Sequence, residues 1–321
     1  MWRSQSASYL EQCTQDGVAA AQCRLFDRIV ADFKSVNWLW IVLVLCLYMF
    51  SNVLRTLRWQ QLFKPLGHKP RFINCLGTLM LGYFANLGFP RSGEFIRAGS
   101  ISKYENIPFE QSFATIVIGR IVDVLMLLLI LGLAFILSYD IFVNYFEQNW
   151  DTPLYKVFIV VGILVAIGIA GIFFLKYIFS TPDEGQSKII VKAKSLMKNF
   201  VEGLKSITKV ENKKLFWLYS MGIWFSYYLM TSLCFNAFGP TEHLGWIAGL
   251  VVFVFGTLGI VFPSPGGMGS YHFLVTQALV ILGLSSVNSF SFAMILFFSI
   301  QLFGNIVFGL ISLVALPILN K

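Results

Sequence analysis

Five stretches of the chain are apolar and long enough to cross a lipid bilayer as helices. They cover residues 38–54, 113–138, 154–175, 215–238 and 290–319. A membrane-spanning helix needs about 20 apolar residues, within a range of roughly 17–25. The pattern therefore predicts an all-α integral membrane protein with about five full transmembrane helices.

Two further apolar stretches are interrupted by proline and glycine. Residues 72–89 end at the sequence Pro-Arg-Ser-Gly of positions 90–93, and residues 244–262 end at Pro-Ser-Pro-Gly-Gly of positions 263–267. The apolar stretch 271–284 that follows the second break is too short to span comfortably. We expect each break to be the tip of a re-entrant helical hairpin, which enters the membrane and returns to the same side.

The positions of lysine and arginine predict the orientation of these elements. Segment 55–71 carries five basic residues and segment 176–214 carries nine, whereas 139–153 and 239–243 carry none. Basic segments stay on the cytoplasmic side. If residues 72–89 crossed the membrane, the nine-lysine segment would become external, so the first hairpin must return to the cytoplasmic side.

The second hairpin is predicted only because its second apolar stretch is too short to span the membrane, and it would open to the outside. Two hairpins of opposite direction, each between two spans, predict a pair of inverted repeats. Many transporters have this architecture, with the binding site between the repeats near the middle of the membrane.

Composition supports the membrane class and divides the chain into two parts. Of the 321 residues 57% are apolar and 12% are charged, against about 45–50% and 25% in soluble domains. Residues 1–36 form a polar N-terminal segment, and residues 37–319 form the membrane domain. The net charge of +8 lies in blocks between apolar stretches, which indicates contact with anionic lipid and not with nucleic acid.

Residues 181–214 of the membrane domain are basic, and apolar residues recur at helical spacing over 186–209. This spacing predicts an amphipathic helix on the inner leaflet; the alternative is an ordinary cytoplasmic helix packed on the bundle. Cys13 and Cys23 would pair only if the N-terminus faced an oxidising compartment, and we do not predict that bond.

The chemistry of the two breaks favours an anionic ligand. Each break begins a new helix, and helix N-termini attract anions, while glycines let the backbone approach a ligand closely. Arginine binds phosphate through two parallel hydrogen bonds. The candidate substrate-binding residues are Arg91, Glu94, Arg97, Arg120, Asp123, Pro265, Gly266, Gly267, Gly269 and His272.

Other roles are open for several of these residues. Arg120 and Asp123 lie three apart within an apolar stretch, where a charge normally has a partner, and they would form a structural ion pair with each other. The group around Glu94 would instead be a solvated hairpin tip. His272 would bond a neighbouring carbonyl, and Arg55 and Arg58 are interpreted as inner-surface anchors.

The sequence contains no recognisable catalytic or metal-binding motif. His68, His243 and His272 lie far apart, and neither a Gly-x-Ser-x-Gly nor a His-x-x-Glu-His sequence nor a P-loop occurs. We therefore predict no catalytic residue, no metal and no cofactor, and we do not expect the chain to be an enzyme.

Four motifs together resemble the lysylphosphatidylglycerol synthase transmembrane family, from about Val36 to the C-terminus. They are Arg-Thr-Leu-Arg-Trp at 55–59, Gly-Tyr-Phe-Ala-Asn-Leu-Gly-Phe-Pro-Arg-Ser-Gly-Glu-Phe-Ile-Arg at 82–97, Gly-Arg-Ile-Val-Asp at 119–123, and Pro-Ser-Pro-Gly-Gly-Met-Gly-Ser-Tyr-His at 263–272. The resemblance implies a lipid-translocating domain. In the bifunctional members a separate soluble domain makes aminoacylated phosphatidylglycerol, and other relatives are linked to polyprenyl-phosphate sugars.

The chain departs from the family in two places. Members commonly have another apolar span where residues 1–36 are polar here, and they often have glutamate at the position of Gly119. The chain ends at Lys321, directly after the last apolar stretch, so we expect no synthase activity from it.

We therefore predict a multi-pass lipid flippase of the cytoplasmic (inner) membrane, which moves an anionic phospholipid or a polyprenyl-phosphate-linked lipid. A separate lipid synthase is an expected partner. Two other functions are open: a membrane glycosyl- or phosphoryl-transferase acting on a polyprenyl phosphate, and a non-transporting scaffold for such a synthase.

Overall fold

The protein is an all-helical integral membrane protein. The computed structural model describes residues 2–15, 19, 23–89, 92–141, 205–261 and 264–320. Among these residues three helical stretches are long and apolar enough to cross a membrane: Trp38–Leu66, Phe109–Leu137 and Ser286–Leu319. They confirm the predicted spans at 38–54, 113–138 and 290–319.

The first two spans are formed by the helices α3 (Trp38–Phe63), which a short 3-10 turn η2 (Lys64–Leu66) extends, and α6 (Phe109–Leu137). The third is a continuous helical stretch of α13 (Ser286–Phe297), a π-helical segment η7 (Phe298–Gly304) and α14 (Asn305–Leu319). Polar contacts hold this stretch against α3, since the Tyr48 hydroxyl donates to Asn305 Oδ1 at 2.7 Å.

The predicted span 215–238 corresponds to α10 (Lys213–Cys234), which two 3-10 turns follow, η4 (Phe235–Ala237) and η5 (Gly239–Thr241). Helix α10 has 22 residues and lies along α3. The predicted span 154–175 lies outside the described residues, as does the part 181–204 of the basic segment. The end of that segment forms a 3-10 turn, η3 (Lys205–Lys209), before α10 begins.

The first broken stretch forms a helical hairpin. Helices α4 (Phe72–Gly88) and α5 (Ser92–Glu105) pack directly against each other. Their backbones approach so closely that a Cβ on Gly93 would collide with the carbonyl oxygen of Gly82. Near the tip, the Gly93 N–H donates to Asn86 Oδ1 at 2.8 Å and closes the turn between the helices.

The second broken stretch also forms a hairpin. Its arms are α11 (Trp246–Val261) and α12 (Ser270–Ile281), with a 3-10 turn η6 (Pro265–Gly267) at the tip. The Ser270 hydroxyl donates to the Gly259 carbonyl at 2.6 Å and joins the two arms. A helix of 16 residues such as α11 is about 24 Å long, shorter than the roughly 30 Å hydrocarbon core of a bilayer.

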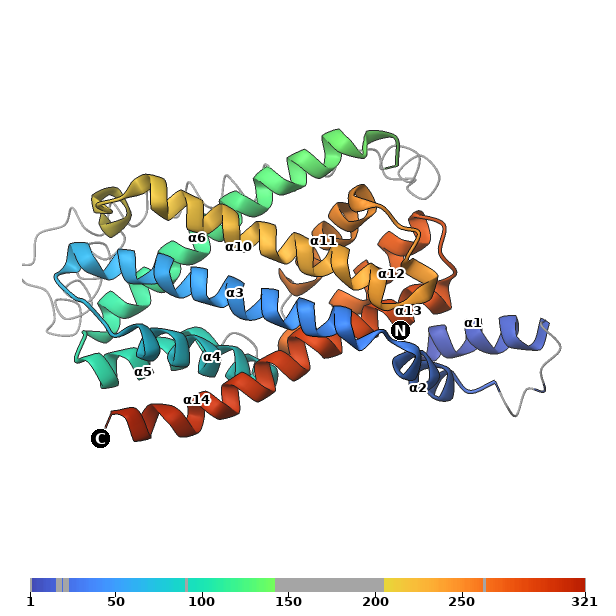
Figure 1. Cartoon of the computed structure of the whole chain (residues 1–321), viewed down its shortest axis with the longest axis horizontal. Helices are drawn as coiled ribbons and strands as arrows, with labels where there is room; N and C mark the ends of the chain where they lie inside the picture. The colour runs from blue at the N-terminus through green and yellow to red at the C-terminus, as the bar shows by residue number, and fades with distance from the viewer. Residues whose placement is uncertain are drawn as a thin grey trace, which may run out of the picture.

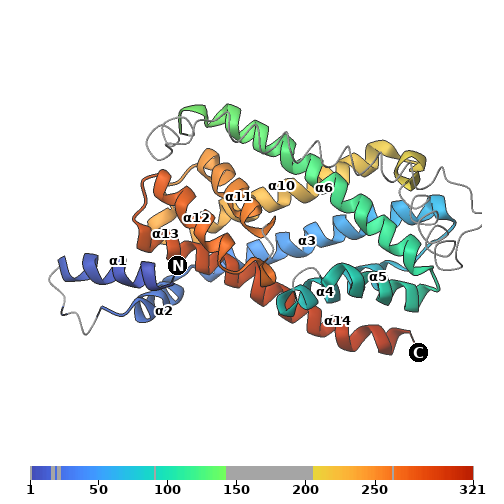
Figure 2. The same ribbon diagram turned by 180° about the vertical axis from the view of Figure 1, so that it is seen from behind.

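The two hairpins point toward each other from opposite ends of the bundle (Figure 1). The view from behind shows the same arrangement, with α4 and α5 at the end where α14 terminates and α11 and α12 at the other end (Figure 2). Their tips meet, because a Cβ on Gly266 would lie 3.1 Å from a methyl carbon of Leu87. The opposed arrangement that the sequence predicts is therefore present in the fold.

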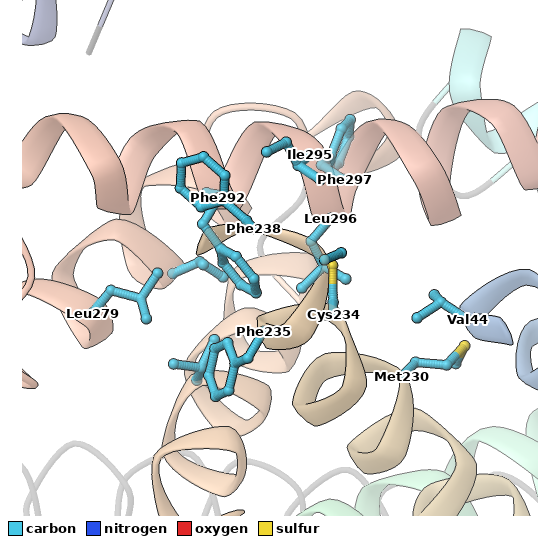
Figure 3. Packing of buried hydrophobic residues seen from close by; sticks show 14 of the residues in the cluster. Val44, Met230, Cys234, Phe235, Phe238, Leu279, Phe292, Ile295, Leu296 and Phe297 are labelled. Atoms are coloured by element: carbon cyan, nitrogen blue, oxygen red, sulfur yellow. The ribbon is translucent and has the colours of Figure 1, made fainter. Parts of the chain in front are cut away.

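The core around the second hairpin is tightly packed. Phe235 and Phe238, at the turn after α10, meet Leu279 of α12 and Phe292 of α13 (Figure 3). The rings of Phe235 and Phe292 have centroids 5.1 Å apart. This cluster holds the second hairpin against the C-terminal helices.

The polar N-terminal segment forms two helices, α1 (Trp2–Gln15) and α2 (Leu25–Ser35). A disulfide bond between Cys13 and Cys23, which the sequence did not predict, lies between them. Helix α2 contacts α13 through a buried carboxylate, since Ser291 Oγ donates to Asp32 Oδ2 at 2.6 Å. The segment is thus attached to the end of the bundle that holds the second hairpin.

The close crossing of α4 and α5 can be tested by two matched substitutions on α5. Gly93→Ala should lower the free energy of unfolding by about 1–3 kcal/mol, the usual effect of overpacking. Gly99→Ala should leave it unchanged or raise it slightly, because a Cβ at Gly99 meets no atom within 4 Å and alanine favours helix. The measurement is reversible unfolding in mixed detergent and SDS micelles. Equal effects at the two positions would contradict the packing described.

Candidate functional site

A single carboxylate inside α6 is bonded to two arginines of α3. Arg55 Nη1 donates to Asp123 Oδ2 at 2.8 Å, and Arg58 Nη2 donates to Oδ1 at 2.9 Å. The arginines are one helical turn apart, so their side chains lie on one face of α3. Arg55 is 7% exposed and Arg58 is 3% exposed. Removing the carboxylate would leave two buried charges without compensation.

The same arginines also bond to α10. Arg55 Nη2 donates to the Tyr227 hydroxyl at 3.0 Å, and Arg58 Nη1 donates to Ser220 Oγ at 3.3 Å. Each guanidinium therefore has a charged and an uncharged acceptor. The network fixes α3, α6 and α10 relative to one another at the end of the bundle that holds the first hairpin.

Arg97 of α5 is buried but has no carboxylate partner among the described residues. Its guanidinium carbon lies 3.5 Å from the ring centroid of Trp59, a cation–π contact that partly compensates for burial. Trp59 is itself held in place, because its Nε1 donates to Thr115 Oγ1 at 2.8 Å. Nε of Arg97 has no hydrogen-bond partner within the described part of the chain.

Arg120 pairs with the first hairpin and not with Asp123. Its Nη2 lies 2.6 Å from Glu94 Oε1, so this pair joins α6 to α5. The other carboxylate oxygen of Glu94 is buried and has no hydrogen-bond partner in the described residues. Arg120 and Asp123 are close in sequence, yet each is bonded to a different helix.

These charged groups surround a small pocket between α3, α5 and α6. Arg55, Arg58, Arg97, Arg120 and Asp123 line it, and the enclosed space is about that of a single water molecule. With Glu94 included, four guanidiniums face two carboxylates, a net charge of +2. The pocket is thus small and positively charged.

The glycine loop of the second hairpin is not part of this pocket. Gly266, Gly267 and Gly269 have φ values of 58°, 81° and 88°, a left-handed conformation that residues with a side chain rarely adopt. The Gly269 N–H donates to His272 Nδ1 at 3.4 Å, and the His272 ring packs 4.5 Å from that of Phe297. His272 therefore bonds a backbone amide, where the sequence suggested a substrate or a carbonyl.

The structure brings four of the predicted site residues together, Glu94, Arg97, Arg120 and Asp123. Arg91 lies outside the described residues, and Pro265 begins the turn at the second tip. The interpretation of Arg55 and Arg58 as inner-surface anchors is wrong, because both are buried against Asp123. Their three-residue spacing on an apolar helix, the same spacing as in Arg120 and Asp123, is the signal that would have identified them.

Comparison with known proteins identifies the relatives of the chain. The family described as Lysylphosphatidylglycerol synthase TM region matches residues 19–318. A UPF0104 membrane protein of Methanocaldococcus jannaschii is 31% identical over 30% of this chain and 30% of its own length. Glycosyltransferase AglD of Haloferax volcanii is 33% identical over 27% of this chain and 14% of its own length. The chain thus matches less than a third of either relative. No solved structure matches it.

The charge pairing predicts unequal effects for neighbouring residues of α6. Asp123→Asn should lower the free energy of unfolding by about 3–5 kcal/mol, because it leaves two buried arginines unpaired. Arg120→Gln should cost less than about 1 kcal/mol, since its ion pair is partly exposed. Reversible unfolding in mixed micelles measures both. A similar large loss in the two variants would indicate that Arg120 and Asp123 are each other's partner.

Proposed function

Because the chain belongs to the lysylphosphatidylglycerol synthase transmembrane family, we propose that it moves an anionic lipid across the membrane. The cargo is a phospholipid or a lipid-linked phosphate whose headgroup binds in the arginine pocket. The observation that carries this proposal is the excess of positive charge in that pocket, where four guanidiniums face two carboxylates. Burying such an excess costs free energy, which an anionic ligand would offset.

The residues of the pocket suit a phosphate group. Among the described residues, Arg97 is the arginine of the pocket that has no carboxylate partner, and the only ion pair of Arg120 is with the partly exposed Glu94. Guanidinium groups bind phosphate oxygens through paired, charge-assisted hydrogen bonds. Arg97 and Arg120 are therefore the proposed phosphate ligands within the described residues, and Arg91 at the tip of the first hairpin is a further one.

The opposed hairpins support movement of the cargo between the two sides. On this proposal both hairpins are re-entrant in the bilayer, and their tips meet near its middle, where Leu87 contacts Gly266. In transporters with inverted repeats, rocking of one repeat against the other opens a central site to each side in turn. The pocket beside α5 would open when the first hairpin moves away from α6.

We place the basic segments in the cytoplasm and the N-terminal helices outside the cytoplasmic membrane. The turn η3, at the end of the lysine-rich segment, and the N-terminal segment lie at opposite ends of the bundle (Figure 1). The disulfide bond between Cys13 and Cys23 supports this orientation, since such bonds persist on the oxidising side of a membrane.

A transferase is the competing function, because one relative is named a glycosyltransferase. Its match covers 14% of that protein, so the name does not show which part of it carries the activity. On our proposal the chain has no transferase activity of its own, and a separate lipid synthase supplies the cargo. Transfer of a sugar or phosphoryl group to a polyprenyl phosphate by the purified chain would favour the competing function.

Lipid movement in proteoliposomes tests the proposal directly. The protein should move acyl-labelled phosphatidylglycerol between leaflets, which dithionite quenching of the outer leaflet measures. Arg97→Gln and Arg91→Gln should each slow this movement by at least about tenfold, the effect of losing a charge-assisted contact of about 1.4 kcal/mol or more. Lys103→Gln is the matched control, because Lys103 is an exposed cation on the same helix and should have no effect.

The two arginine variants must remain folded for this comparison, which their elution as single species in detergent shows. If both moved lipid at the rate of the unsubstituted protein, neither Arg97 nor Arg91 would bind the headgroup. Equal slowing by Lys103→Gln would indicate a general loss of positive charge as the cause.

The orientation predicts how many thiols react with a maleimide. The chain has five cysteines, and the structure leaves Cys46, Cys75 and Cys234 as free thiols. Protein denatured without reductant in the presence of a polyethylene glycol maleimide should add three of these groups, and five when it is reduced first. Five additions without reductant would mean that the N-terminal helices face a reducing compartment.

A further inference from the structure

Arg120, which is bonded to Glu94, is the most exposed of the residues that line the arginine pocket. Arg120 of α6 is 48% exposed and Glu94 of α5 is 22% exposed. Val124, one helical turn after Arg120 and therefore on the same face of α6, is exposed, and so is Phe95 beside Glu94. Exposed apolar side chains of a membrane protein face the acyl chains, so the Glu94–Arg120 pair lies where the pocket borders on lipid.

Two hydrogen-bonding groups near this ion pair have no partner among the described residues. Only one carboxylate oxygen of Glu94 is bonded, to Arg120, and the other is buried without a partner among the described residues. Nε of Arg97, one turn further along α5, is also unpartnered within that part of the chain. Each such group costs free energy. A larger anion with more oxygens would satisfy Arg97 and Arg120 together.

We propose that Glu94 occupies the place of a lipid phosphate in the closed protein, and that a phosphodiester from the bilayer displaces it from Arg120. A carboxylate and a phosphodiester each carry one negative charge, so Arg120 keeps a partner of the same charge after the exchange. Breaking the Glu94–Arg120 contact also removes an ion pair between α5 and α6, and leaves the stacked rings of Phe95 and Phe113 as a contact between these helices. The pair is thus a lateral gate that its own ligand opens.

This inference rests on the proposed function, because the cargo of that function is the ligand that opens the gate. It adds that the headgroup enters between α5 and α6, directly from the bilayer. The same phosphate chemistry is present in the free ion, but a ligand without acyl chains would not concentrate at a lipid-facing opening. Phosphatidylglycerol and inorganic phosphate are therefore the two probes.

If the ion pair is a gate, substituting its two residues should change the affinity for phosphatidylglycerol in opposite directions. Glu94→Gln removes the competing carboxylate and should bind phosphatidylglycerol roughly twofold to fivefold more tightly, the range expected for releasing a partly exposed ion pair. Arg120→Gln removes a ligand of the phosphate and should bind it more weakly than the unsubstituted protein. Native mass spectrometry or thermophoresis of detergent-solubilised protein titrated with the lipid measures both.

Glu110→Gln is the matched control. Glu110 lies at the start of α6, does not line the pocket, and its substitution changes the net charge of the protein by the same amount. Its affinity for phosphatidylglycerol should equal that of the unsubstituted protein. Equal tightening in Glu110→Gln and Glu94→Gln would indicate a general charge effect and overturn the gate, as would unchanged or weaker binding in Glu94→Gln.

Two further measurements identify the source of the phosphate and distinguish a failure of the gate from a failure of the proposed function. Inorganic phosphate at millimolar concentration should not displace bound phosphatidylglycerol, and full displacement would overturn the lipid source. Binding is measured without translocation, so tighter binding by Glu94→Gln would support the gate even if lipid movement failed. Active lipid movement with no change in the affinity of Glu94→Gln would overturn the gate alone.

Discussion

The contact of Asp123 with Arg55 and Arg58 determines how the long helices are placed. An isolated charge inside an apolar bundle is costly, and a shared carboxylate reduces that cost only if its partners stay within hydrogen-bond distance. The distances of 2.8 and 2.9 Å meet this requirement. Helices α3 and α6 are therefore fixed relative to each other, and Tyr227 adds α10 to the same network.

Asp123 cannot neutralise all the arginines of this region, and the proposed function follows from the excess of positive charge. Arg97 is buried beside Trp59 with no acidic partner in the described residues, and Arg120 has only the partly exposed Glu94. Both lie where α5, an arm of the first hairpin, meets α6. The network on α3, α6 and α10 thus lies next to the first hairpin, whose arm α5 is joined to α6 by packing and by an accessible ion pair.

Structural features that depend on contiguous residues could be predicted from the sequence. Continuous apolar stretches predicted three spans that the structure confirms, and the Pro/Gly breaks predicted two hairpins. Their opposed directions were inferred from the positions of lysine and arginine and from segment length. Ion pairs between residues far apart in the sequence could not be predicted from it. Arg55 is 68 positions from Asp123, whereas the three-residue spacing suggested Arg120 as its partner. The disulfide was not predicted because it depends on the compartment of the N-terminus, which cysteine spacing does not show.

The buried arginines should select an anionic lipid, and the lipid that copurifies with the protein tests this selection most directly. Mass spectrometry of protein extracted from its native membrane should show an anionic phospholipid or lipid-linked phosphate enriched over its abundance in that membrane. The enrichment should be lost in Arg97→Gln. A lipid composition equal to that of the surrounding membrane, unchanged by this substitution, would contradict the account.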